Sequence, residues 1–494
     1  MTVLRTAPAP FVALLGRAGT GTFALFAFFL LILPVLTVLS SLHAAAPTRP
    51  NIVYIMADDL GQGDIGPFGQ KKIRTPNLDR LATEGTCFDQ FYPGASVCSP
   101  TRCVLMTGLH TGHARIRGNH GIAGTGRVPL LAEDVTVAEL LHDAGYATAI
   151  AGKWGLGEPG TSGIPNRQGF DHWFGYLNND LAEDYFPEKI WKNEEEISLP
   201  GNAGGKRTQF SNDLMTEEAL TFIDANRAKP FFLYLAYTIP HAVWEVPADS
   251  LAEYDGKFEE PASAGARDGK VTTARPRATY AAMITRLDRE VGRVLASLRE
   301  RGLDERTIVF FCSDNGAPTD RAGVGKFFGS TGPYRGNKGS LWEGGIRAPM
   351  IVRWPGHVPA GKRSDFVWAG WDVMPTAAAL AGLVPPKRTD GIDVLPALRG
   401  QPLTRERTLY WENVQNKFSQ AIRIGDLKAV RHETAGPIEV YNLRTDPGES
   451  KNLAATESAF VARATGLFRT ARTESEHWPL AKIGAKKKGS PATP

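Results

Sequence analysis

A short segment of the chain sets a cysteine, a proline and an arginine at a spacing that suits chemistry at the start of a helix. Cys98 is followed by Pro100 and Arg102, and Gly108 can end the helix. Proline is tolerated in the first helical turn, so Cys98 would face free N–H groups and the positive end of the helix dipole, a position that favours an anion. A buried packing role, a disulfide with Cys103, or half of a metal site explains the local pattern equally well.

Further polar side chains follow four segments that are typical of buried strands. The pairs of strand and following residue are 51–56 with Asp58 and Asp59, 147–151 with Lys153, 231–237 with His241, and 307–312 with Asp314 and Asn315. In an open parallel sheet, ligands bind beyond the carboxyl ends of the strands, so these groups are predicted to meet at one edge. Each alone could simply mark a strand leaving the core, but their agreement favours a shared site.

The residue types at this predicted edge indicate a hard cation and an oxyanion. Carboxylate and amide oxygens suit Ca2+, or Mg2+, rather than zinc; those available are on Asp58, Asp59, Asp314 and Asn315. The positive groups that would surround the cation are Arg102, Lys153, His241 and Lys338. A positive pocket at a helix start should bind a compact oxyanion, so we expect a sulfate or phosphate ester as ligand.

The elements that would position these residues alternate along the chain. Helical patterns at 75–85, 137–144, 213–225 and 280–298 lie between the strands, which predicts an α/β domain with a large, mainly parallel sheet flanked by helices. Strand patterns at 409–412, 420–424, 428–431 and 438–443, followed by a helix at 454–472, predict a small C-terminal antiparallel sheet plus helix. Residues 255–277 and 316–339 are expected to be loops over the site, as surface insertions or as substrate-binding segments.

Composition excludes some function classes, and the N-terminus indicates a location. The 494 residues carry 56 Lys and Arg against 52 Asp and Glu, a balance that does not indicate nucleic-acid binding. Arg5 and Arg17 precede an apolar stretch at 23–42, and three alanines at 44–46 suit signal peptidase, which predicts export into the periplasm, a lumen or the medium. The stretch is also long enough to remain as a membrane anchor.

These patterns divide the chain into four parts. We expect a signal peptide or signal anchor at 1–46, a catalytic domain at 47–400, a small α+β subdomain at 401–479 and a basic disordered tail at 480–494. Four cysteines are too few for a disulfide framework, although one bridge between Cys87 and Cys103 stays open.

The segment around Cys98 resembles the signature of the formylglycine-dependent (type I) sulfatases, in which Cys-x-Pro-x-Arg is followed by a Thr-Gly pair. Further segments resemble other family motifs in the same order: 57–61 the first metal motif, 152–157 the second signature, 313–316 the second metal motif, 335–338 with 343–349 the sulfate-binding lysine segment, and 441–453 the C-terminal domain. The likeness covers nearly the whole chain after the first fifty residues.

This resemblance implies an alkaline-phosphatase-like fold and an arylsulfatase-like enzyme. It implies that a separate maturation enzyme converts Cys98 to formylglycine, whose hydrate attacks the sulfur of a sulfate ester with help from Ca2+ and from Asp314 as base. Lys338 and His241 would stabilise or protonate the departing oxygen, Lys153 would hold a sulfate oxygen, and Arg102 would hold the hydrate. The implied metal ligands are Asp58, Asp59, Asp314, Asn315 and the modified Cys98.

Three positions depart from the family pattern. Gly155 stands where many members have a histidine, and Leu181 and Glu183 stand where similar sequences often have histidines. His113 is a candidate replacement, and Trp244 is a candidate contact for a sugar.

The substrate and two other functions are left open. The sulfate ester could belong to a carbohydrate or to an aryl compound. A phosphoester hydrolase of the same superfamily and a non-catalytic binder of sulfated polysaccharide are the alternatives. A membrane is expected as a partner only through an uncleaved N-terminal anchor.

Overall fold

The computed structural model describes residues 49–121, 127–261, 273–415 and 418–480. The predicted signal segment at 1–46 and residues 481–494 of the predicted basic tail lie outside these residues. Within the described part of the chain, no helix is both long enough and apolar enough to span a bilayer.

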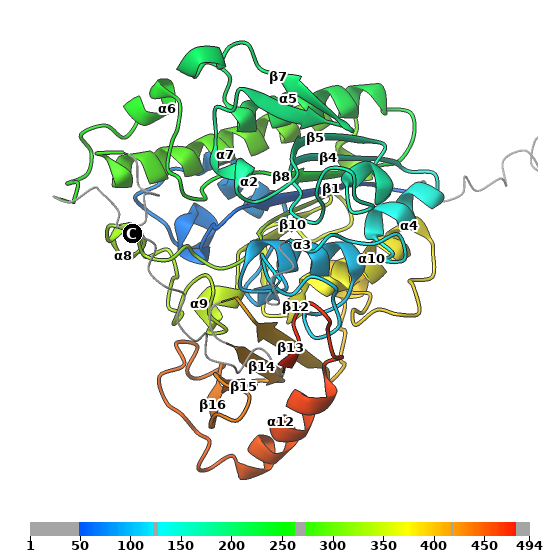
Figure 1. Ribbon diagram of the computed structural model, residues 1–494, viewed down its shortest axis with the longest axis vertical. Helices are drawn as coiled ribbons and strands as arrows, with labels where there is room; N and C mark the ends of the chain where they lie inside the picture. The colour runs from blue at the N-terminus through cyan, green and yellow to red at the C-terminus, as the bar shows by residue number, and fades with distance from the viewer. Residues whose placement is uncertain (1–48, 122–126, 262–272, 416–417, 481–494) are drawn as a thin grey trace, which may run out of the picture. The chain divides into compact units, whose positions relative to one another are not determined.

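A ten-stranded mixed sheet forms the centre of the fold (Figure 1). Its strands, in chain order, are β1 (Asn51–Ala57), β2 (Thr86–Phe88), β4 (Ala147–Lys153), β5 (His172–Tyr176), β6 (Lys189–Lys192), β7 (Glu195–Ser198), β8 (Phe231–Ala236), β9 (Thr307–Ser313), β10 (Met350–Arg353) and β11 (Lys362–Ser364). Their order across the sheet is β11-β2-β10-β9-β1-β8-β4-β5-β6-β7. The central strands β9, β1, β8, β4 and β5 are parallel, so their carboxyl ends share one edge.

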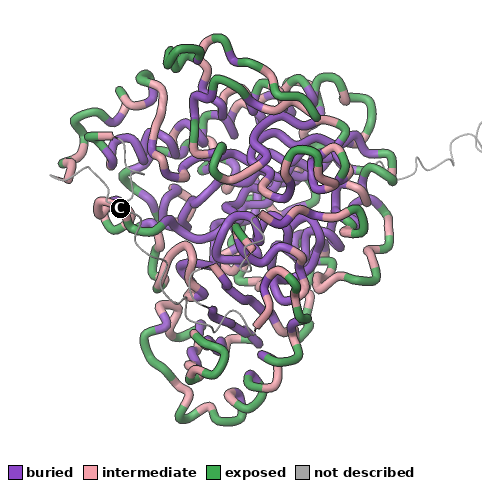
Figure 2. The backbone as a smooth tube through the Cα atoms, in the orientation of Figure 1, coloured by how far each residue is buried: buried purple, intermediate pink, exposed green. Residues whose placement is uncertain are grey.

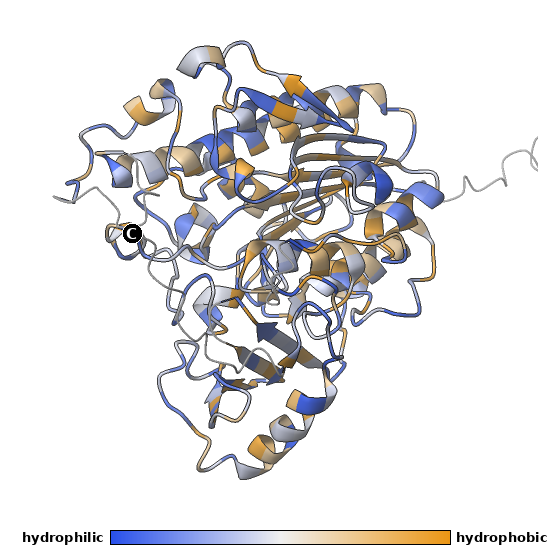
Figure 3. Cartoon of the chain, viewed as in Figure 1, coloured by the Kyte–Doolittle hydropathy of each residue, from blue (hydrophilic) through white to orange (hydrophobic). Residues whose placement is uncertain are grey.

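The sheet is buried on both faces, which explains why its central strands are nearly continuous apolar runs. Along β1, Ile52, Tyr54 and Met56 belong to the core on one face, and Val53 and Ile55 belong to the core on the other. Successive side chains of a strand point to opposite faces, so one strand contributes to two cores. The burial map shows this continuous interior, and the hydropathy map shows apolar residues along the same strands (Figures 2 and 3).

Helices cover the two faces in separate layers. The first layer contains α2 (Pro76–Glu84), α5 (Ser211–Ala225), α6 (Ala248–Ala252) and α7 (Pro276–Glu300), and the second contains α3 (Cys98–Thr107), α4 (Val137–Asp143) and α10 (Val373–Ala381). Shorter helices are α8 (Val324–Phe328), α9 (Glu343–Ile346) and α11 (Leu395–Leu398). In Figure 1, α5 and α7 lie above the sheet and α3 and α10 below it.

A second, four-stranded antiparallel sheet follows near the C-terminus. It consists of β13 (Thr408–Asn413), β14 (Ser419–Ile424), β15 (Leu427–Arg431) and β16 (Ile438–Asn442), and α12 (Ser458–Thr470) packs against it. Phe460, Ala464 and Phe468 of α12 share a core with Ile422 and Val440. A third sheet has two strands, β3 (Phe91–Tyr92) and β12 (Trp368–Ala369).

The predicted fold class is confirmed, and the differences are local. The segment expected as a loop at 316–339 contains α8, and the helix expected at 280–298 runs from Pro276 to Glu300. Pro276 occupies the first helical turn, where its missing N–H costs nothing, so the helix starts there rather than at the first residue of the apolar pattern.

Candidate active site

The helix α3 presents Cys98 at its first turn and ends at Gly108, which adopts a left-handed conformation with φ +67°. Glycine is favoured there because it has no Cβ to clash. All ten residues of α3 are buried, so the helix is held firmly by the core. Its start lies beside the carboxyl ends of β1, β4 and β9, because Cys98 and Arg102 contact Asp58, Lys153 and Asp314.

Three carboxylates and one amide meet at these strand ends. Asp58 and Asp59 follow β1, and Asp314 and Asn315 follow β9, the neighbouring strand; all four are at most 1% exposed. The backbone N–H of Asp59 donates to Asp314 Oδ1 at 3.1 Å, and Asn315 Nδ2 donates to Asp59 Oδ1 at 2.8 Å. Asp59 has φ +66°, a conformation that is uncommon outside glycine and turns its side chain into the cluster.

Four cationic or imidazole side chains surround the acidic cluster. Lys153 Nζ lies 2.7 Å from Asp58 Oδ2, and Arg102 Nη2 lies 3.0 Å from Asp314 Oδ2. Lys338 Nζ donates to Asp59 Oδ2 at 2.9 Å and to Cys98 Sγ at 3.3 Å. His241 follows β8, and its Nε2 lies 3.6 Å from Asp59 Oδ2. The structure therefore brings together every residue predicted for catalysis or metal binding from the four strand ends and the helix.

The surroundings keep Cys98 protonated. The pKa of its thiol is raised to about 12, chiefly by burial. The negative charges of Asp314 and Asp58 also raise this pKa, and they outweigh Lys153 and Lys338, which lower it. A thiol with such a pKa is almost entirely protonated at neutral pH and is a poor nucleophile. The protein groups around Cys98 thus favour the thiol over the thiolate.

The charge states of the neighbouring groups follow from burial and from each other. Burial alone would raise the pKa of Asp58, but the charges of Lys153 and Arg102 hold it below its ordinary value. Burial and the charge of Asp58 raise the pKa of Asp314. Burial, together with Lys338, lowers the pKa of His241 to about 3, so its imidazole is neutral near pH 7.

The donor atoms of this cluster fit a hard cation. Asn315 Oδ1 is buried and accepts no hydrogen bond from any described residue, while its Nδ2 is fixed by Asp59 and by the Gly316 carbonyl. Ligand atoms of Asp58, Asp59, Cys98 and His241 all lie within 4.8 Å of one another. An unsatisfied buried amide oxygen beside several carboxylates is the arrangement that a divalent cation bound through oxygen atoms requires.

A pocket of about 300 Å³ opens above Cys98. The described residues that line it are Val97, Cys98, Asn119, His120, Lys153, Asn179, Asp180, Glu183, His241, Thr319, Arg321, Lys338, Gly339 and Gln415. The lining combines cationic side chains (Lys153, Arg321 and Lys338) with neutral and acidic polar ones. Such a lining suits an anion that carries a polar group.

Two residues that the sequence suggested for the substrate lie elsewhere. His113 follows the far end of α3, and its Nδ1 lies 2.9 Å from Asp390 Oδ1. Trp244 is 1% exposed, donates to the Pro240 carbonyl and packs against Tyr280. Neither is among the described residues that line the pocket, so the structure does not support them as substrate contacts.

The space beside Gly155 is filled by other side chains. Gly155 has φ +78°, and a Cβ there would lie 3.0 Å from Asn179 Oδ1 and 3.2 Å from Ser99 Oγ. Asn179 Nδ2 donates to Ser99 Oγ at 2.8 Å, next to Cys98. A polar pair thus occupies the place where the sequence pattern led us to expect a histidine.

All four cysteines are buried and free, so the bridge between Cys87 and Cys103 does not form in this structure.

Sequence reasoning missed several residues of the pocket wall, among them Asn119, His120, Asn179 and Gln415. They lie in irregular segments between elements, where no periodic pattern or strand end marks them. Asn119 and His120 follow the signature segment by less than twenty residues, but nothing in the sequence shows that this loop returns to Cys98.

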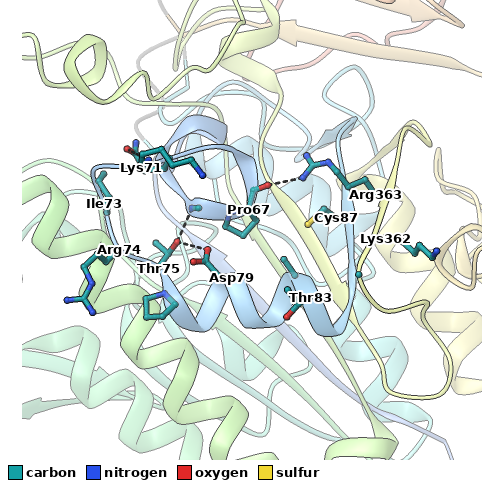
Figure 4. A pocket seen from close by; sticks show the side chains of 15 residues that line it. Pro67, Lys71, Ile73, Arg74, Thr75, Asp79, Thr83, Cys87, Lys362 and Arg363 are labelled. Carbon is teal, nitrogen blue, oxygen red and sulfur yellow. Dashed lines mark hydrogen bonds between the residues drawn. The ribbon is translucent and has the colours of Figure 1, made fainter.

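A larger open cleft of about 570 Å³ lies between α2 and β11 and is lined by residues that include Lys71, Arg74, Cys87, Lys362 and Arg363 (Figure 4). Burial raises the pKa of Cys87 to about 11, so this thiol is not activated. Arg363 donates to the Pro67 carbonyl, and Arg74 pairs with Glu253. None of the described residues that line this cleft belongs to a cluster that could hold a metal ion.

Comparison with known proteins now identifies the family. Residues 50–383 match the family model described as Sulfatase, and residues 335–465 match the model described as N-sulphoglucosamine sulphohydrolase, C-terminal. The chain belongs to the sulfatase family. This sulfatase is therefore a sulfuric ester hydrolase.

The similarity between this sulfatase and its relatives extends over most of each chain. It is 33% identical over 466 residues to N-acetylgalactosamine-6-sulfatase of Mus musculus, covering 89% of this chain and 83% of the relative. It is 32% identical over 460 residues to arylsulfatase A of Homo sapiens, covering 82% and 83%. Among solved structures, Ps i-CgsB in complex with k-i-k-neocarrahexaose superposes with a TM-score of 0.73 at 28% identity, covering 87% of this chain and 95% of that chain.

Proposed function

We propose that this sulfatase is an exported enzyme that removes sulfate from a carbohydrate, with Cys98 converted to formylglycine and Ca2+ in the acidic cluster. The observation that carries the proposal is the setting of Cys98. Its thiol is buried at a helix start, has a pKa raised to about 12 and lies against Lys338 and Asp58. That setting suits the precursor of an aldehyde better than a reactive thiol.

The acidic cluster holds the metal in this proposal. Asp58, Asp59, Asp314 and Asn315 offer oxygen ligands, and residue 98 completes the set after modification. A bound Ca2+ would polarise the sulfate group and favour deprotonation of the hydroxyl that attacks it. The unsatisfied Oδ1 of Asn315 beside three carboxylates supports a hard cation, with Mg2+ as the other ion of this class.

The modified residue and the side chains around it have different roles in the reaction. One hydroxyl of a hydrated formylglycine would attack sulfur, and the other would then lose its proton and reform the C=O bond, which breaks the bond to the first oxygen and expels sulfate. Arg102, fixed by Asp314 and by the Lys153 carbonyl at 2.7 Å, orients residue 98. Asp314, whose pKa is raised by burial and by Asp58, is the base proposed for the attacking hydroxyl.

The leaving group departs on the side of Lys338 and His241. The pKa of Lys338 lies well above its ordinary value because Asp59, Cys98 and Asp58 outweigh the effect of burial, so the ammonium stays charged and donates hydrogen bonds. Neutral His241 lies on the same side of Asp59 and shares the departing oxygen. Lys153, completely buried against Asp58, holds a sulfate oxygen.

The pocket wall favours a sugar over an aryl ring as the group that carries the sulfate. Val97 is the one aliphatic side chain among the described lining residues, and none of them is Phe, Tyr or Trp. Polar walls bind hydroxyl groups, whereas aromatic ligands are usually held by apolar and aromatic side chains. The relative named N-acetylgalactosamine-6-sulfatase and the complex with neocarrahexaose support the same substrate class.

Each part of the chain has its own role in the proposed function. Residues 47–400 supply the catalytic groups, and the subdomain at 401–479 supplies Gln415 to the pocket wall. The basic N-terminal residues, the apolar stretch at 23–42 and the alanines at 44–46 support export. A separate maturation enzyme is required because nothing in an ordinary thiol site oxidises cysteine to an aldehyde.

Mass spectrometry of the protein made with a formylglycine-generating enzyme tests this proposal. The peptide that contains residue 98 should lose one sulfur and two hydrogens and gain one oxygen, and the protein should hydrolyse 4-nitrophenyl sulfate and a carbohydrate sulfate. Cys98→Ala should remove turnover, while Cys103→Ala, a matched change in the same helix, should keep it. An active protein with only unmodified cysteine at position 98 would contradict the proposal.

A further inference from the structure

The loop that carries Asn119 and His120 touches both the nucleophile helix and the pocket. Asn119 Oδ1 accepts a hydrogen bond from the backbone N–H of Ser99 at 3.1 Å, which satisfies one of the free N–H groups at the start of α3. Asn119 and His120 both line the pocket above Cys98. The placement of this loop therefore sets the shape of the pocket next to the reacting residue.

Two segments far along the chain hold this loop. The backbone N–H of Asn119 donates to Gln415 Oε1 at 2.7 Å, in the segment between β13 and β14. Trp478 Nε1 donates to the His120 carbonyl at 3.3 Å from the segment that follows α12. A Cβ on Gly118 would lie 3.1 Å from Trp478 Nε1 and 3.2 Å from Gln415 Oε1, so the loop is enclosed on both sides.

The segment that carries Trp478 is itself fixed by a buried ionic network. Arg472 Nε lies 2.9 Å from Glu412 Oε2, and Arg117 Nη1 lies 3.1 Å from Glu412 Oε1. Arg117 also donates to the Thr473 carbonyl at 3.0 Å, and the N–H of Thr473 donates to the Gly112 carbonyl at 3.0 Å. The side chains of the two arginines and Glu412 are at most 3% exposed, so the segment is fastened directly to the loop before Asn119.

Trp478 has the burial of a core residue although it lies near the end of the described chain. It is 0% exposed and belongs to the core on the α3 side of the sheet. Its backbone carbonyl accepts from Arg472 Nη2 at 3.4 Å, and the N–H of Leu480 donates to Glu474 Oε1 at 3.0 Å.

We infer that residues 472–480 form a strap that shapes the substrate side of the active site, with Trp478 as the positioning residue that fixes His120 and, through the same loop, Asn119. The inference rests on the proposed function, because it assigns the wall of that pocket to substrate binding. Trp478 acts through the loop and does not touch the reacting atoms. Its loss should therefore weaken binding of the sugar more than it slows the reaction at sulfur.

The test compares four forms of the full protein made with the maturation enzyme. Trp478→Phe keeps most of the ring packing but removes the N–H donor, and Trp478→Ala removes both. A chain ending after residue 480 retains the whole strap and is the matched control for a chain ending after residue 471. Each form is first checked for formylglycine content and for its melting temperature.

The kinetic readout separates a positioning role from a purely structural one. With Trp478→Phe, KM for a carbohydrate sulfate should rise about threefold to tenfold, the effect of one hydrogen bond, while kcat changes less than KM. The KM for 4-nitrophenyl sulfate, which lacks sugar hydroxyls, should rise less. The chain ending after residue 480 should behave as the full chain does, and the chain ending after residue 471 should show the largest rise in KM.

Hydrogen exchange gives a second readout that needs no substrate. In Trp478→Phe, amides at 114–120 should exchange faster than in the unchanged protein, while those of the distant helix α7 keep their rates. Unchanged KM together with unchanged exchange in Trp478→Phe would overturn the inference, as would an equal loss of kcat on both substrates with a lowered melting temperature. If Trp478→Ala does not fold, Trp478→Phe and the two truncations decide. Absence of formylglycine in the unchanged protein would instead overturn the proposed function.

Discussion

Lys338 Nζ lies 3.3 Å from Cys98 Sγ and 2.9 Å from Asp59 Oδ2, so one ammonium group joins the reacting residue to the acidic cluster. The side chain is 16% exposed and reaches the pocket from a loop that follows α8, far from both partners in the sequence. This contact gives Lys338 a fixed place between residue 98 and the acidic cluster.

Replacing Lys338 should affect catalysis much more than folding. Lys338→Ala is expected to lower kcat for 4-nitrophenyl sulfate about a hundredfold to a thousandfold, because a charged donor at the departing oxygen is lost. Lys362→Ala, which changes an exposed lysine of β11, is the control and should leave kcat as it is. Kinetics on both variants with equal formylglycine content provide the measurement, and similar kcat values for the two would show that Lys338 is misassigned.

Asn315 should control the affinity for the metal. Asn315→Ala removes the unsatisfied Oδ1, so the Ca2+ concentration that restores half of the activity after chelation should rise about tenfold to a hundredfold. Asn226→Ala, at the end of α5, serves as the matched control, since Asn226 Nδ2 donates only to the Phe222 carbonyl. Titration of Ca2+ into the chelated proteins measures the effect, and identical curves for both variants would exclude Asn315 as a ligand.

A buried ion pair holds the C-terminal sheet to the catalytic part. Lys428 Nζ lies 2.9 Å from Glu343 Oε1 and 2.8 Å from Glu449 Oε1, with all three side chains fully buried. Lys428→Met leaves Glu449 without this ionic partner and leaves Glu343 with Arg347, at 3.1 Å, so it should lower the free energy of unfolding by about 3–5 kcal/mol. Lys189→Met removes an exposed pair with Glu196 and should leave the unfolding curve unchanged. Denaturant unfolding of both variants is the test, and equal stabilities would contradict this account.

Asp64 should give stability a distinct pH dependence. Burial raises its pKa from 3.8 to about 6, although the Tyr280 hydroxyl and the Gly61 N–H donate to Oδ2. Between these pH values the unfolded chain loses a proton that the folded protein keeps. Folding is thus favoured at the lower pH, and the contribution is lost as the pH rises through 6.

Asp64→Asn removes this titration and provides the comparison. The free energy of unfolding of the unchanged protein minus that of Asp64→Asn should fall by about 2.4 kcal/mol between pH 4 and pH 7, because the pKa is raised from 3.8 to about 6 and the unfolded carboxyl is already partly ionised at pH 4. Denaturant unfolding at several pH values measures the difference. A difference that stays constant across this range would show that the pKa of Asp64 is the same in the folded and the unfolded protein.

The sequence predicts the central strands well because their signals are local. Residues 51–56 form a continuous apolar run that ends in two aspartates, and the observed β1 covers Asn51–Ala57. The sequence did not predict β6, β7 and β11, which lie toward the two ends of the strand order, because they are short and carry exposed charged residues. It did not predict β2, β5 and β10 either. Their pairing depends on neighbours that are distant in the sequence.

The same contrast between local signals and contacts of distant segments applies to the residues of the site. Asp58, Asp59, Lys153, Asp314 and Asn315 were predictable because each follows a strand, and parallel strands deliver their ends to one edge. His113 lies near the signature in the sequence, yet it pairs with Asp390 at the other end of α3. A helix of ten residues spans roughly 15 Å, so proximity in the chain does not mean proximity in space.

The sequence by itself determined the chemistry of this protein, because Cys98, Arg102, the strand-end carboxylates and the lysines are recognisable from residue type and spacing. Only the tertiary structure decided which groups form the wall of the pocket. Asn119, Gln415 and Trp478 come together through hydrogen bonds between segments separated by hundreds of residues. Such contacts arise from the packing of whole layers, and no local pattern in the chain encodes them.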